Sequence, residues 1–112
     1  MALNNNITSY QIYLSSHLHN HEWQANIILR ENNIPVIDLR FVADPANYGS
    51  KGKINATGIS IVYAGIERYS WFVDMLRNET PLVAVLYSPI GALPVRLLLQ
   101  TGLEVTGENE GD

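Results

Sequence analysis

In the first third of the chain, apolar and polar side chains alternate in three successive segments separated only by short polar connections. A period of two is that of a strand with one buried face, so the pattern predicts strands over 8–18, 23–30 and 36–42. Connections this short join neighbouring antiparallel strands, so the three segments should form a meander. The second connection contains Asn32-Asn33, which suits a type I′ turn because asparagine tolerates positive φ.

The alternation also assigns side chains to the two faces of the expected sheet, because successive residues of a strand point to opposite sides. In the first segment one face carries Tyr10, Ile12, Leu14 and Leu18. In the second it carries Trp23, Ala25, Ile27 and Leu29. In the third, Ile37, Leu39 and Phe41 lie opposite Asp38 and Arg40. The apolar faces are expected to form the core.

The rest of the chain predicts three more strands, over 56–64, 82–88 and 95–101. Segment 82–88 is apolar on both faces, as in a central strand that is covered on both sides. Segment 43–55 contains proline, glycine and asparagine without any period and is expected to be a surface loop. The residues of 56–64 that should share a face are Ile59, Ile61 and Tyr63.

One helix is predicted, over residues 66–78, because apolar side chains recur there with i, i+3, i+4 spacing. The stripe consists of Ile66, Tyr69, Phe72, Val73 and Leu76. Six strands and one helix indicate an α+β fold with mostly antiparallel pairing. We expect a small, partly open barrel, or alternatively a sheet with the helix across one face. Residues 1–106 should form one domain, and the acidic residues 107–112 a mobile tail.

Composition excludes several functions. The 112 residues contain no cysteine, which rules out disulfides, thiolate zinc sites and cysteine catalysis. The net charge is −4 and the arginines are scattered, which argues against nucleic-acid binding. No signal peptide or membrane-spanning segment is expected, because the N-terminal residues lack a basic and an apolar region and no apolar run is long enough. We therefore expect a cytoplasmic protein without a cofactor.

The three histidines of the chain, His17, His19 and His21, stand at alternating positions. On a strand they would point to one side, and three imidazoles with a water can bind zinc. However, His19 and His21 fall in the connection between two predicted strands, where alternation ends, and Glu22 is the nearest carboxylate. The alternatives are a metal site, a pH-sensitive patch and a solvated hairpin tip, of which the tip is the simplest interpretation.

A second candidate site is the stretch YGSKGK at 48–53, in which Ser50, Lys51 and Lys53 could bind an anion. The full phosphate-loop pattern is absent, because Lys53 is followed by isoleucine and a strand rather than by a helix. Asp38 and Arg40 on the polar face of their strand are further candidates for ligand binding. We expect them to pair with cross-strand partners such as Arg30 or Glu31 rather than with each other.

Trp71 and Met75 lie four residues apart on the predicted helix, away from its apolar stripe. An exposed tryptophan–methionine pair on a chain with few charges indicates an interface, since both residue types are enriched there. We expect a homodimer through this pair. The alternative is that a loop such as 88–94 covers it within the same chain.

Neither a nucleophile elbow nor a metalloprotease or dinucleotide motif is present. We therefore expect a non-enzymatic binding or assembly module that associates with itself and with a protein partner or a small ligand. No nucleic-acid or membrane partner is expected. The alternative is a small metal-dependent or hydrolase-like enzyme, centred on the three histidines and the 43–55 loop.

Overall fold

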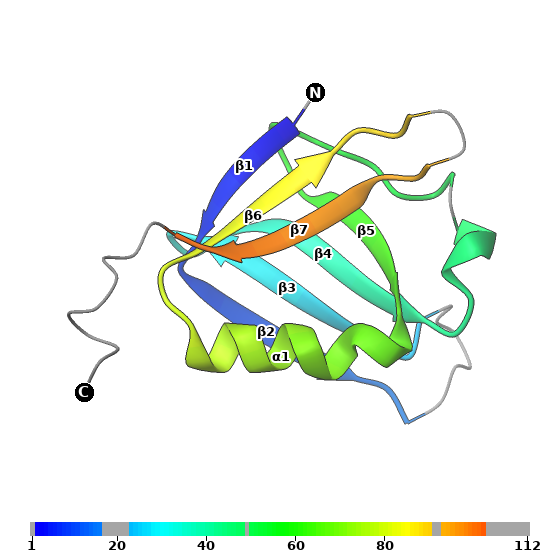
Figure 1. Cartoon of the computed structure of the whole chain (residues 1–112), viewed down its shortest axis with the longest axis horizontal. Coiled ribbons are helices and arrows are strands. Elements are labelled where there is room, and N and C mark those ends of the chain that lie inside the picture. Colours follow the sequence, from blue (N-terminus) through cyan, green and yellow to red (C-terminus); the bar gives the residue numbers. More distant parts are fainter. Residues whose placement is uncertain (1, 17–22, 49, 91–92, 103–112) are drawn as a thin grey trace.

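The computed structural model describes residues 2–16, 23–48, 50–90 and 93–102 (Figure 1). Within them the chain forms seven strands, one α-helix and two 3₁₀ turns, which confirms the α+β class. The strands are β1 (Ala2–Ile7), β2 (Ser9–Leu14), β3 (Ala25–Glu31), β4 (Ile34–Val42), β5 (Ser60–Gly65), β6 (Leu82–Tyr87) and β7 (Arg96–Thr101). The helix is α1 (Tyr69–Asn78), and the turns are η1 (Pro45–Tyr48) and η2 (Ile66–Arg68).

The strands form two sheets, which Figure 1 shows lying one over the other with α1 along one side. The first sheet has the order β1-β6-β7 and the second has the order β2-β3-β4-β5. All neighbouring strands are antiparallel except β4 and β5, which are parallel. No hydrogen-bonded ladder joins β5 to β7, so the barrel is not closed. No helix in the described part of the chain is long and apolar enough to cross a membrane.

The predicted meander is confirmed by β2, β3 and β4, which are consecutive neighbours in the second sheet. Asn32 and Asn33 join β3 to β4 with φ angles of 53° and 70°, as a type I′ turn requires. Strand β2 is shorter than the strand predicted over residues 8–18. It ends at Leu14, whose side chain is 72% exposed, whereas Leu18 lies outside the described residues.

Strand β1 was not expected from the sequence, because Asn4-Asn5-Asn6 is a run of poor strand formers. It pairs along its whole length with β6, a segment about eighty residues further along the chain. Leu3, Asn5 and Ile7 are half-buried while Asn4 and Asn6 are exposed, so alternation is present but weak. The Asn5 amide nitrogen donates to the Glu31 carboxylate at 3.1 Å, whereas the buried Asn5 Oδ1 has no hydrogen-bond partner among the described residues.

Strand β5 begins later than the predicted 56–64, and the face that Ile61 and Tyr63 share is the outer one. The strand begins at Ser60, and the inward side chains are those of Ser60 and Val62, whereas Ile59 is exposed. Fully buried Ser60 is tolerated because its hydroxyl accepts a 2.8 Å hydrogen bond from the Asn55 N–H and donates to the Asn55 carbonyl. The long connection 43–59 provides the chain length that a parallel β4–β5 pair needs.

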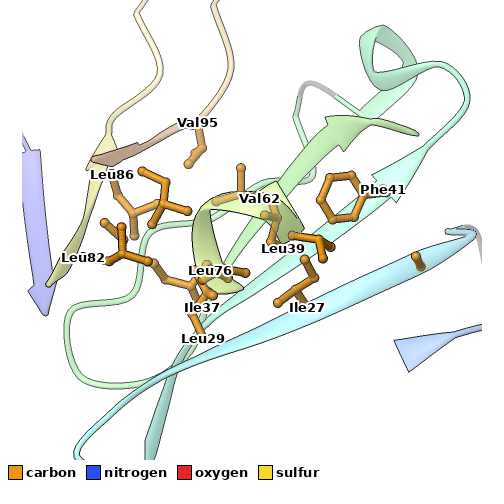
Figure 2. Packing of buried hydrophobic residues seen from close by; sticks show 14 residues of the cluster. Ile27, Leu29, Ile37, Leu39, Phe41, Val62, Leu76, Leu82, Leu86 and Val95 are labelled. Atoms are coloured by element: carbon orange, nitrogen blue, oxygen red, sulfur yellow. The ribbon is translucent and has the colours of Figure 1, made fainter. Parts of the chain in front are cut away.

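The core lies between the two sheets and α1, and Figure 2 shows its closely packed aliphatic side chains. It includes Ile27, Leu29, Ile37, Leu39 and Phe41 from the second sheet and Leu82, Ala84 and Leu86 from the first. In β3 and β4 these are the inward positions predicted from alternation, whereas the sequence of β6 is apolar on both faces and did not distinguish them. The outer face of β6 is only partly covered by the described residues, since Tyr87 is exposed.

Elements η2 and α1 together span the predicted helix 66–78. Val73 and Leu76 are buried, whereas Ile66, Tyr69 and Phe72 are half-buried and pack against the core. The Phe41 ring forms T-shaped contacts with two rings of the helix. Its centroid lies 5.2 Å from that of Tyr69 and 5.8 Å from that of Phe72. These ring contacts connect the helix to Phe41 of β4.

Candidate functional site

The outer face of the second sheet carries the polar side chains that alternation directs away from the core. The register places Asn26 of β3 opposite Arg40 of β4, and Arg40 beside Tyr63 of β5. Three neighbouring strands thus contribute one continuous row of hydrogen-bonding side chains. Asp38 lies in the same face, two residues before Arg40.

Arg40 is the centre of this row. Its Nε donates to Asp38 Oδ2 at 3.0 Å, and its Nη1 donates to the Tyr63 hydroxyl at 2.9 Å. The other carboxylate oxygen of Asp38 accepts a 3.0 Å hydrogen bond from the Asn26 amide. The Arg40 and Asp38 side chains are only 19% and 14% exposed, so each charge is compensated by the other rather than by water.

The expected pairing of Asp38 and Arg40 with Arg30 or Glu31 was wrong. Arg30 instead donates to the Gln11 side chain, and Glu31 accepts from Asn5. The reason is the central position of β4, whose cross-strand neighbours on this face are the uncharged Asn26 and Tyr63. The two opposite charges of β4 therefore compensate each other.

Aromatic rings flank this ion pair on both sides. The guanidinium carbon of Arg40 lies 4.0 Å from the centroid of the Trp23 ring. On the other side, Tyr63 stacks on Tyr48 of η1 with ring centroids 4.8 Å apart. We call Trp23, Asp38, Arg40, Tyr48 and Tyr63 the aromatic–arginine cluster.

The sequence assigned Trp23 to the core face of its strand, and this was wrong. Trp23 precedes β3, so strict alternation does not apply to it, and its ring packs on the outer face instead. Tyr63 was assigned a face shared with Ile61, which is the outer face in the structure. No local spacing in the sequence could have identified this cluster, because Trp23, Arg40, Tyr48 and Tyr63 come from separate segments of the chain.

The 43–55 loop lies beside the cluster, as Tyr48 shows, and the Lys51 ammonium is 5.0 Å from the Tyr48 ring centroid. Ser50 is exposed. Lys53 forms an isolated bridge with Ile61, which places it at the edge of β5. The N–H groups of Lys51 and Lys53 already donate to the carbonyls of Tyr48 and Ile61. An anion at this loop would therefore be held by side chains rather than by these N–H groups.

Two pockets border the cluster. One has a volume of about 490 Å³ and is lined by Trp23 and Asn26 together with Tyr13 and Ile28. The other has a volume of about 330 Å³ and is lined by Tyr48 and Tyr63 together with Pro45 and Pro94. The cluster thus reaches one pocket through Trp23 and the other through Tyr48 and Tyr63.

The proposed metal ligands His17, His19 and His21 lie outside the described residues. In the part of the chain that is described, no group of three or more histidine, aspartate or glutamate side chains is arranged to hold a metal ion. The three histidines therefore stay a prediction from the sequence.

Of the expected interface pair Trp71 and Met75, only Trp71 is exposed as predicted. Trp71 is 63% exposed, whereas Met75 is half-buried and packs against the core. Strand β7 lies beside them, and none of the described residues of 88–94 lines the same groove. Leu97, Leu98 and Leu99 line one groove of about 210 Å³ together with both residues, and Leu98 is 44% exposed.

Comparison of the chain with protein-family models, with curated proteins and with solved structures found no match.

Proposed function

We propose that the protein is a non-enzymatic binding module that holds a protein partner on the outer face of the sheet β2–β5. The observation that carries this proposal is the aromatic–arginine cluster, in which Arg40 lies between Trp23 and the Tyr63 hydroxyl. Tryptophan, tyrosine and arginine are the residues most enriched at the energetic centres of protein interfaces.

The chemistry of the cluster favours binding over catalysis. Both carboxylate oxygens of Asp38 are engaged by hydrogen bonds, so this carboxylate serves to position Arg40. Within the described residues, Arg40 Nη2 donates no hydrogen bond and can donate to a carbonyl of a partner. The rings beside it have few rotatable bonds, so little side-chain entropy is lost when they are covered.

The test uses the full chain as an immobilised ligand, followed by a dissociation constant for each captured protein after its purification. We expect Arg40→Gln and Trp23→Ala each to weaken binding by about tenfold or more, since truncation at an interface centre costs about 2 kcal/mol. Arg30→Gln is the matched control, because Arg30 lies on the same face but outside the cluster. Equal affinity of Arg40→Gln, Trp23→Ala and the wild type would contradict the proposal.

A small ligand in one of the two bordering pockets is the other candidate for this face. The metal-dependent or hydrolase-like alternative, centred on His17, His19 and His21 and the 43–55 loop, is tested by metal analysis of the purified protein. The absence of a cofactor and of a nucleic-acid or membrane partner, and a cytoplasmic location, stay predictions from the sequence.

Self-association is a second proposed property, and a separate observation favours it. Exposed Trp71 of α1 and exposed Leu98 of β7 line the same groove, so they form one apolar patch from two elements. Apolar patches of this kind mark interaction sites. We propose a homodimer through this patch.

A further inference from the structure

Strand β2 is an edge strand of the second sheet, with β3 on one side and no described strand on the other. Ser15, directly after β2, donates its N–H to the carbonyl of Gln24, directly before β3. Backbone groups alternate in direction along an antiparallel strand, so the N–H and carbonyl groups of Tyr10, Ile12 and Leu14 point away from β3. We call this row of backbone groups the open edge.

The other three edge strands each have a described neighbour beside their outer side. Lys53 forms a bridge with Ile61 and so occupies part of the edge of β5. The helix α1 lies beside β7, and the two line one groove. Strand β1 lies close to β3 as well as to β6. In contrast, β3 is the one described element that packs closely along β2, so the open edge is the most accessible to a further strand.

The sequence of β2 also lacks the features that keep an exposed edge from pairing. Native edge strands are commonly protected by charged side chains, proline or a bulge. The segment SYQIYL contains no charged residue, no proline and no glycine. It extends for about 20 Å, which matches a partner strand of about six residues. An uncharged and regular edge of this length favours pairing with another extended chain.

The apolar side chains next to the open edge are incompletely covered. Tyr10 and Ile12 pack against the core but stay half-buried, and Leu14 is 72% exposed. Directly opposite residues of neighbouring strands have their side chains on the same face of the sheet. A strand paired with β2 would therefore bury these three side chains if its alternate residues were apolar.

The open edge is continuous with the aromatic–arginine cluster. The pocket of about 490 Å³ is lined by Tyr13 and Leu14 of β2 and also by Trp23 of the cluster. A partner that pairs with β2 can therefore extend across this pocket to Trp23. The edge and the cluster form one surface on which a single partner fits.

We infer that the partner adds an extended segment to the open edge of β2, an inference that rests on the proposed function. The occupant is a polypeptide, because an extended backbone has donors and acceptors with the spacing of a strand edge. In this mode of recognition main-chain hydrogen bonds supply affinity and alternate side chains supply specificity. The segment is apolar at alternate residues and has no proline at the residues that bond β2.

The experiment titrates the full chain with a capped peptide of about seven alternating valines and threonines that carries a polyethylene glycol tail for solubility. Near saturation, amide hydrogen exchange of Tyr10, Ile12 and Leu14 should slow by about tenfold. Gln11 and Tyr13 are the internal control, because their N–H groups face β3 and are protected with and without the peptide. Unchanged exchange along the open edge at the solubility limit of the peptide would overturn the inference.

Two variants at one position test the hydrogen bonds. Leu14→Pro removes an N–H of the open edge, whereas Leu14→Ala shortens the side chain but keeps this N–H and is the matched control. Leu14→Pro should bind the peptide about fivefold more weakly than Leu14→Ala, because one hydrogen bond is lost. Equal affinity of the two variants would contradict the inference. If Leu14→Pro fails to fold, the exchange measurement on the wild-type protein decides.

The same variants separate this inference from the proposed function. If a purified partner loses affinity on Trp23→Ala but not on Leu14→Pro, the cluster binds it and the open edge does not, so the inference alone fails. If neither variant changes the affinity, both fail. Slow exchange at the open edge in the concentrated protein alone, which becomes fast on dilution, would show that a second copy pairs there and would also overturn the inference.

Discussion

The guanidinium of Arg40 packs on the face of the Trp23 ring, with 4.0 Å between the guanidinium carbon and the ring centroid. Backbone bonds hold the two in place, because the Gln24 N–H donates to the carbonyl of Phe41 at 2.9 Å. A cation–π contact of a partly desolvated guanidinium contributes about 0.5–2 kcal/mol. Arg40 therefore links the start of β3 to β4 and β5 on the outer face, where we place the binding surface.

The first prediction concerns the ion pair. Asp38→Ala should lower the free energy of unfolding by about 1–3 kcal/mol, because the largely buried Arg40 then lacks its charged partner. Urea unfolding measures the change. The double variant with Arg40→Ala should lose less than the sum of the two single variants. Full additivity would show that the two charges do not interact.

The second prediction separates two phenylalanines of the core. Phe41→Ala should cost about 3–5 kcal/mol, because Phe41 is fully buried and contacts Tyr69 and Phe72. Phe72→Ala should cost less, because Phe72 is half-buried at the edge of the core. Urea midpoints of both variants check the order. A Phe72→Ala variant that is less stable than Phe41→Ala would place the centre of the core under α1 rather than between the sheets.

The third prediction tests self-association. Sedimentation should show a dimer of the wild-type protein, and Trp71→Ala combined with Leu98→Ala should shift it to a folded monomer. Tyr13→Ala is the matched control, because Tyr13 is also an exposed aromatic residue but lies on β2. A wild-type protein that stays monomeric at high micromolar concentration would contradict the proposed homodimer.

The fourth prediction concerns His17, His19 and His21. A chelator should leave the melting temperature unchanged, because in the described part of the chain the fold is held by a core of packed aliphatic and aromatic side chains. A structural metal would contribute its binding energy to folding, so its removal would lower the melting temperature. A substantial decrease that zinc reverses would show that the three histidines hold a structural metal.

The sequence by itself determined the elements whose pattern is local. The period of two marked β2, β3 and β4, and the i, i+3, i+4 spacing marked the helix. Asn32-Asn33 marked the turn, because few residues other than glycine accept its positive φ angles. These features depend on backbone geometry and on side chains a few residues apart.

The tertiary structure alone decided which segments lie side by side. Strand β1 forms because β6 offers it a partner, and Val62 of β5 points inward because the register pairs it with buried Leu39 of β4. The aromatic–arginine cluster likewise combines residues from several elements, so no local spacing predicts it. The physical reason is that alternation specifies a face for each side chain, whereas the neighbour across that face depends on how distant apolar surfaces are buried together.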